Sequence, residues 1–126
     1  MTGQQLYDIS MDILSLRLES GEIPSGCADM TARAVGLINL LIAENAFLDA
    51  RLKGEGVETQ NISTLSDEIP LSQPIAAQAL PYGLAALLIL NENASVASML
   101  HGIYTSALEY IGRSFGARLH WIEEVY

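Results

Sequence analysis

Residues 79–111 read ALPYGLAALLILNENASVASMLHGIYTSALEYI, and this stretch decides the fold. Its first part, up to residue 90, is almost wholly apolar, and its last part carries apolar residues three and four positions apart. That spacing is typical of an amphipathic helix, and turn-forming residues at 90–95 separate the two parts. The stretch therefore predicts two helices joined by a short turn, with Asn93 or Ser95 capping the second helix.

Three residues set the expected limits of these two helices. Ser72 is a suitable cap for the earlier helix, which has Pro74 in its first turn, where a missing N–H costs little. Pro81 lies inside that helix and predicts a kink, because proline removes one backbone hydrogen bond. Gly112 follows the later helix and predicts its end.

Two further helices are predicted in the first 53 residues. Thr2 and Gln5 match a capping box, and the apolar stripe that follows predicts a helix ending near Ser20–Gly21. A second helix is expected from about residue 28 to Lys53, with Gly54 as its stop. Because this second helix is apolar on more than one face, we expect it to be the central helix.

The segments 54–73 and 113–126 lack a clear helical period. In 54–73, isolated apolar residues stand among polar ones, which is compatible with short strands or with an extended loop lying on the core. The aromatic-rich 113–126 favours an extended arm of β character. The predicted fold class is thus all-α: a helical domain over 1–112, a bundle of about four helices with a connector loop at 54–73, followed by a C-terminal arm.

Charge narrows the range of functions. The 126 residues include 15 acidic and 6 basic side chains, for a formal charge of −9, which argues against a basic nucleic-acid-binding surface. Residues 54–112 contain no Lys or Arg. This stretch is interpreted either as an ordinary solvated acidic face or as a surface that repels DNA or docks a basic partner.

The sequence offers little for catalysis or metal binding. Cys27, His101 and His120 form no recognisable nucleophile or zinc motif, and no phosphate-binding loop is present. An enzyme that uses Cys27 or a His–carboxylate pair is the least favoured alternative, and no cofactor or metal is expected. The N-terminal residues do not resemble a secretory signal, and the apolar runs are too short for a membrane span, so we expect no membrane association.

Several phrases resemble one known group of proteins. TGQQLYDISMDIL (2–14), TARAVGLINLLIAE (31–44), TLSDEIPL (64–71), the stretch 79–111 and the closing IEEVY (122–126) look like the small α-helical head–tail connector (adaptor, or head-completion) proteins of tailed phages and prophages. The resemblance implies a non-enzymatic virion protein that forms a ring on the portal and extends the DNA channel. It implies the portal protein and a tail or stopper protein as partners, and no sequence-specific nucleic-acid binding.

The resemblance also implies an arrangement of parts and a location. The subunit is expected to be a homo-oligomer in the virion and to be able to exist as a monomer when isolated. It is expected in the host cytoplasm during assembly. The candidate assembly residues are Phe115, Leu119, Trp121, Ile122, Val125 and Tyr126 in the arm, and Ile62, Leu65, Ile69 and Leu71 in the connector loop. The candidate channel-facing acids are Glu55, Glu58, Asp67 and Glu68. The alternative is a small acidic helical interaction or regulatory module of a bacterium.

Overall fold

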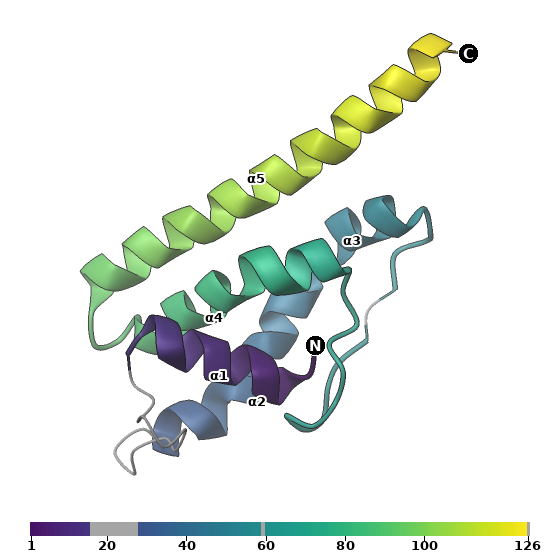
Figure 1. Cartoon of the computed structure of the whole chain (residues 1–126). Coiled ribbons are helices and arrows are strands. Elements are labelled where there is room, and N and C mark those ends of the chain that lie inside the picture. The colour runs from purple at the N-terminus through teal and green to yellow at the C-terminus, as the bar shows by residue number, and fades with distance from the viewer. Residues whose placement is uncertain (16–27, 59, 126) are drawn as a thin grey trace.

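The computed structural model describes residues 1–15, 28–58 and 60–125, and for residues 28, 29 and 115–125 it describes the backbone only. The regular elements of these residues are all helical, which confirms the all-α prediction (Figure 1). They are α1 (Gly3–Ile13), α2 (Ala28–Glu44), α3 (Ala46–Lys53), the π-helical turn η2 (Ile75–Ala79), α4 (Leu80–Ile89) and α5 (Ala94–Val125).

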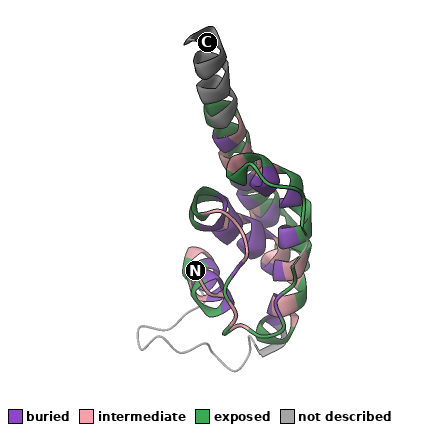
Figure 2. Ribbon diagram, turned by 90° about the vertical axis from the view of Figure 1, so that its right-hand side faces the viewer, coloured by how far each residue is buried: buried purple, intermediate pink, exposed green. Residues whose placement is uncertain are grey.

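The central helix is α4. It packs against α1, α2 and α5, and in Figure 1 it lies between α5 and the α1–α2 pair. Figure 2 shows the buried residues gathered on the sides where the helices face one another. The prediction of a central helix at 28–53 is therefore wrong, because α2 leaves Gly36 and Leu40 exposed whereas α4 is surrounded. The buried residues of α4 are Leu80, Pro81, Gly83, Leu84, Ala85, Ala86 and Leu88.

The first helix begins as predicted and ends earlier. Thr2 and Gln5 form the expected capping box, and the Ser10 hydroxyl donates to the Pro81 carbonyl at 3.1 Å, which ties α1 to α4. The helix ends at Ile13, and Ser15 takes a left-handed φ of 59° that an α-helix does not continue through. The predicted end at Ser20–Gly21 is therefore wrong, and those two residues lie outside the described ranges.

The predicted second helix is divided in two. The axes of Met30–Glu44 and Ala46–Lys53 differ by 56°, with Asn45 at the break. Gly54 ends α3 with a left-handed φ of 70°, which confirms the predicted stop. Because of this division, five α-helices stand among the described residues where the sequence predicts about four.

The connector 54–73 is an extended loop that lies on the core, one of the two forms expected for it. The Asn39 side chain donates to the Ile62 carbonyl at 3.0 Å and accepts from the Ile62 N–H at 2.8 Å. Gly3 N–H donates to the Asp67 carbonyl at 3.0 Å, so the loop is also joined to the start of α1. The described part of the loop contains a single isolated bridge, Thr2–Glu68, in place of strands.

The irregularity expected at Pro81 takes the form of the π-helical turn η2. Leu80 N–H bonds to the Ile75 carbonyl, five residues back, immediately before the proline that lacks a donor. The helical conformation begins at Gln73, directly after Ser72, so Pro74 stands in the first turn as predicted. The Ser72 carbonyl accepts from the Ala76 N–H, but its hydroxyl donates to Asp49 and does not cap a backbone N–H of the helix.

The last helix is much longer than predicted. Asn93 caps it, accepting from Val96 N–H at 3.1 Å, and it then runs for 32 residues, or about 48 Å. The predictions of an end at Gly112 and of a β-like arm at 113–126 are therefore wrong. A glycine costs a helix only about 1 kcal/mol, and the stretch after Gly116 is rich in good helix formers such as Ala, Arg, Leu and Glu.

Candidate interaction surface

Helix α5 has one buried side and one exposed apolar side. Among residues 94–114, whose side chains the structure describes, the buried ones are Ala97, Leu100, Tyr104 and Ile111, which belong to the core. Met99, Ile103 and Tyr110, here called the α5 flank, are 59%, 41% and 66% exposed. Intervals of four and seven residues are close to whole turns, so the three side chains of the flank share one side of the helix.

This alignment separates the flank from ordinary surface hydrophobics. Single exposed apolar residues are common and need no explanation, whereas adjacent ones on one face mark a site of interaction. The other large exposed apolar side chains among the described residues are spread over other elements: Ile9, Leu40, Phe47, Val57 and Leu90. The α5 flank is therefore the strongest candidate for a protein-binding surface.

A shallow apolar groove lies between α4 and the start of α5. Its volume is about 260 Å³, and Leu90, which is 52% exposed, lines it at the end of α4. His101 also lines it, with its ring centroid 5.8 Å from that of Tyr104. The structure thus places His101 in the lining of this groove. The remaining lining residues are Ala86, Leu87, Ala94, Ala97 and Ser98.

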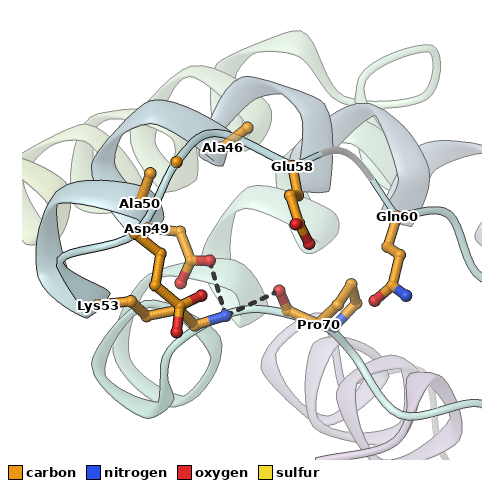
Figure 3. A pocket seen from close by; sticks show the side chains of 9 residues that line it. Ala46, Asp49, Ala50, Lys53, Glu58, Gln60 and Pro70 are labelled. Carbon is orange, nitrogen blue, oxygen red and sulfur yellow. Dashed lines mark hydrogen bonds and ion pairs between the residues drawn. The ribbon is translucent and has the colours of Figure 1, made fainter.

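A second, polar recess lies between α3 and the connector (Figure 3). Its volume is about 70 Å³, room for about two water molecules. Glu55 and Glu58 both line it, and Figure 3 shows the Glu58 carboxylate directed into it. Lys53 crosses its edge, with Nζ 2.9 Å from the Asp49 carboxylate and 3.5 Å from the Pro70 carbonyl. The structure thus brings two of the four candidate channel-facing acids to one place.

Asp49 is the polar anchor of this recess. Its carboxylate accepts from the Ser72 N–H at 2.6 Å and from the Ser72 hydroxyl at 2.5 Å. Burial raises the pKa of Asp49, but the hydrogen bonds from Ser72 and Lys53 together outweigh burial and hold that pKa below its usual value. Asp49 therefore ties α3 to the segment just before η2.

This anchor predicts an acid-dependent contribution to stability. A lowered folded-state pKa means that the Asp49 carboxylate stabilises the fold at pH values above its unfolded-state pKa, near 3.8, and loses that effect as the pH falls through the lower folded value. We expect Asp49→Asn to be about 1–2 kcal/mol less stable than the wild type at pH 7. Urea unfolding should show this gap closing below pH 4. A gap that is constant from pH 7 to pH 2.5 would contradict the assignment.

The other two candidate acids lie against the start of α1. The Asp67 carboxylate accepts from the N–H groups of Ser63 and Thr64, at 2.7 and 3.1 Å, and these bonds lower its pKa. The Glu68 carboxylate is 3.0 Å from the Met1 amino group. Asp67 is therefore bonded within its own loop and Glu68 is paired with the N-terminal residue, and neither acid lines the recess that Glu55 and Glu58 share.

The predicted assembly residues fall into two groups. In the connector, Ile62 and Ile69 are buried in the core, and Leu65 and Leu71 are half-buried against it, so we leave these four out of the exposed surface. In the arm, the structure shows the backbone of 115–125 as helix. The side chains of Phe115, Leu119, Trp121, Ile122, Val125 and Tyr126 lie outside the described residues, and their predicted role stays a prediction.

Sequence reasoning placed Met99, Ile103 and Tyr104 on one apolar helix and missed that they divide between two sides. The signal was available, because Met99 and Ile103 lie off the line through Leu100, Tyr104 and Ile111. It also missed Asn45 and Asp49, which are buried polar residues in an apolar helix pattern. No local motif marks them, because their partners Tyr104 and Ser72 are far away in the sequence.

The described residues contain no group of three or more His, Cys, Asp or Glu side chains placed to hold a metal ion. Among the same residues, no single helix is long and apolar enough to cross a membrane. One pair of consecutive helices, Met30–Glu44 and Ala46–Lys53, is long and apolar enough when the two are taken together, but the pair is bent by 56° at Asn45. Comparison with known proteins gives no match to a protein family, a curated protein or a solved structure.

Proposed function

We propose that this chain is a head–tail connector (adaptor) subunit of a tailed phage or prophage, a non-enzymatic protein that assembles as a ring on the portal and extends the DNA channel. The observation that carries the proposal is the α5 flank, Met99, Ile103 and Tyr110, on a helix whose adjacent side is already packed on α4. The flank is an apolar surface available to a second protein. The resemblance of the sequence to connector proteins suggests which protein that is.

The dimensions of α5 support an assembly role. The helix has 32 residues, whereas η2 and α4, on which it packs, have 5 and 10. At about 1.5 Å per residue, α5 is roughly twice as long as these two elements together. Much of it is therefore not covered by the pair along which it lies, and we propose that adjacent subunits and the portal contact it.

The distribution of charge supports the conduit part of the proposal. Glu55, Glu58 and Glu68 are exposed, and no Lys or Arg occurs between residues 54 and 112. Exposed carboxylates repel DNA phosphates, so a channel wall made of such a surface would let DNA pass without gripping it. We propose that Glu55 and Glu58, which line one recess, face the channel.

A triple substitution of the flank tests the proposal. Replacing Met99, Ile103 and Tyr110 by Gln keeps good helix formers on an exposed surface, so the subunit is expected to fold normally. If each side chain buries enough apolar surface to contribute about 1 kcal/mol on assembly, binding to a phage portal protein that forms rings with the wild-type chain should weaken about 100-fold. Light scattering and negative-stain electron microscopy of the mixture measure the loss of rings.

Matched controls come from exposed apolar residues elsewhere. Ile9→Gln and Val57→Gln make the same kind of change on α1 and on the connector, away from α5, and are expected to assemble normally. A flank variant that joins the portal as tightly as the wild type would show that the flank is not the interface. If the wild-type chain fails to bind the portal, the connector proposal itself is contradicted.

The acidic recess favours a second candidate, a bacterial interaction module that binds a basic protein. Glu55 and Glu58 line the recess, with only Lys53 as a counter-charge among its lining residues. Such binding should be lost in the Glu55→Gln, Glu58→Gln double variant and should weaken as salt is raised. Capture of a basic partner that is reversed by salt, together with failure to bind portal, would favour this candidate over the connector.

A further inference from the structure

The bend between α2 and α3 is not caused by a proline, a glycine or a serine. Sharp helix kinks occur at proline, at glycine or serine, at π-bulges, or where a side chain enters the backbone hydrogen-bond ladder. Residues 37–53, LINLLIAENAFLDARLK, contain no proline, glycine or serine and are rich in Leu, Ala, Glu, Lys and Arg. The chain by itself would favour one continuous helix here, so the cause of the bend must be sought in side-chain contacts.

Those contacts centre on Tyr104 of α5. Asn45, which is 2% exposed, donates from Nδ2 to the Leu41 carbonyl and to the Tyr104 hydroxyl, both at 2.8 Å. The Tyr104 hydroxyl in turn donates to Glu44 Oε1 at 2.6 Å. One hydroxyl therefore contacts both residues at the break, and the Asn45 side-chain amide shares the Leu41 carbonyl with the Asn45 backbone N–H.

The position of that hydroxyl is set by α4 and α5. Tyr104 is buried, and its ring lies so close to Gly83 of α4 that a Cβ at Gly83 would be 2.9 Å from Cδ2. A ring held in this way cannot follow α2 and α3 if they move. Tyr104 is thus a fixed point against which the bend is held.

Helix α3 is lightly attached to the rest of the molecule. Of its eight residues only Ala46, Asp49 and Ala50 are buried. Leu48 and Leu52 are partly buried against the core, and two polar contacts lead to the connector, from Asp49 to Ser72 and from Lys53 to the Pro70 carbonyl. A segment with few buried apolar contacts opens at low cost, and any movement of α3 would carry the connector with it.

We propose that the Tyr104 hydroxyl is a latch that holds α3 bent away from the axis of α2, and that its release lets α3 swing and reposition the connector 54–73. Straightening an 8-residue helix, about 12 Å long, through 56° would move its far end by about 11 Å. The inference goes beyond the proposed function and does not depend on it, because it concerns contacts within one chain.

The test removes the hydroxyl and keeps the ring. Spin labels are placed at Arg51→Cys on α3 and Ser106→Cys on α5, in a Cys27→Ser background, with and without Tyr104→Phe. We expect Tyr104→Phe to shift or broaden the distance distribution between the labels by about 5–10 Å and to speed amide hydrogen exchange in α3 at least tenfold. Circular dichroism confirms that the variant is folded. Tyr110→Phe makes the same change at an exposed site on α5 and should alter neither readout.

A folded Tyr104→Phe variant with the wild-type distances and exchange rates would overturn the proposal. If Tyr104→Phe does not fold, Glu44→Ala decides, since it removes only the acceptor and leaves the ring and the Asn45 bond in place. We expect Glu44→Ala to raise exchange in α3 about threefold or more, with exchange in the buried part of α5 unchanged. Unchanged exchange in α3 of that variant would overturn the proposal as well.

Discussion

Leu84→Ala is expected to destabilise the protein by about 3 kcal/mol. Leu84 is completely buried in α4, the helix that contacts α1, α2 and α5, so the surrounding helices cannot collapse easily into the space left behind. Leucine-to-alanine changes in such cores cost about 2–5 kcal/mol, from lost burial and from the cavity. This is a large part of the 5–15 kcal/mol that stabilises a typical domain. The midpoint of urea unfolding, followed by circular dichroism, measures it.

Leu90→Ala is the matched control for this prediction. Leu90 follows α4 directly and is 52% exposed, so the same chemical change removes little buried surface and leaves no cavity. We expect it to cost no more than about 1 kcal/mol. Equal losses for Leu84→Ala and Leu90→Ala would show that α4 is not the centre of the core.

Gly83→Ala is expected to destabilise the protein by about 2 kcal/mol, although alanine is the better helix former. A Cβ at Gly83 would lie 2.9 and 3.0 Å from two ring carbons of Tyr104 and 3.2 Å from a methyl carbon of Leu41. The Tyr104 ring is buried and its hydroxyl is bound, so it cannot give way cheaply. With contacts this short we expect overpacking near the upper end of the usual range, about 3 kcal/mol, which exceeds the gain in helix propensity of about 1 kcal/mol by about 2 kcal/mol.

Gly36→Ala makes the identical change where nothing opposes it. Gly36 is exposed in the middle of α2, and a Cβ there would meet no atom within 4 Å. The gain in propensity should then appear alone, as a stabilisation of about 1 kcal/mol. Thermal unfolding of the two variants should give melting temperatures on opposite sides of the wild type. A Gly83→Ala variant as stable as Gly36→Ala would contradict the close packing of α4 on Tyr104.

The sequence predicted those parts of the fold that local patterns govern. The capping box of Thr2 and Gln5, the cap at Asn93 and the stop at Gly54 each depend on residues within one turn, and all three are confirmed. The break at Asn45 could not be predicted, since its partner Tyr104 is 59 residues away. The continuation of α5 past Gly112 was missed because two glycines and several aromatics were given more weight than the helix formers around them.

The candidate surface was less predictable than the fold. An apolar stripe shows that a helix is amphipathic, but exposure on the flank of α5 depends on how α4 and η2 cover that helix. Met99 and Tyr110 are therefore identifiable as surface residues only after packing is known. Conversely, Ile62 and Ile69 stand alone among polar residues, a pattern that favours contacts with another subunit. The Asn39 side chain, which holds Ile62 by both backbone groups, places that part of the loop in the core.

The attachment of the connector to the start of α1 has a consequence for the order in which the chain folds. Gln4 N–H bonds to the Leu65 carbonyl, and Ile69 N–H bonds to the Met1 carbonyl. These partners are separated by more than 60 residues, which a ribosome needs about 3–12 s to add. Helix α1 is synthesised first, yet its loop partners and α4 come far later. During translation the apolar face of α1 therefore lacks its α4 and connector partners at first, and a truncated nascent chain would be the form of this protein most dependent on chaperones.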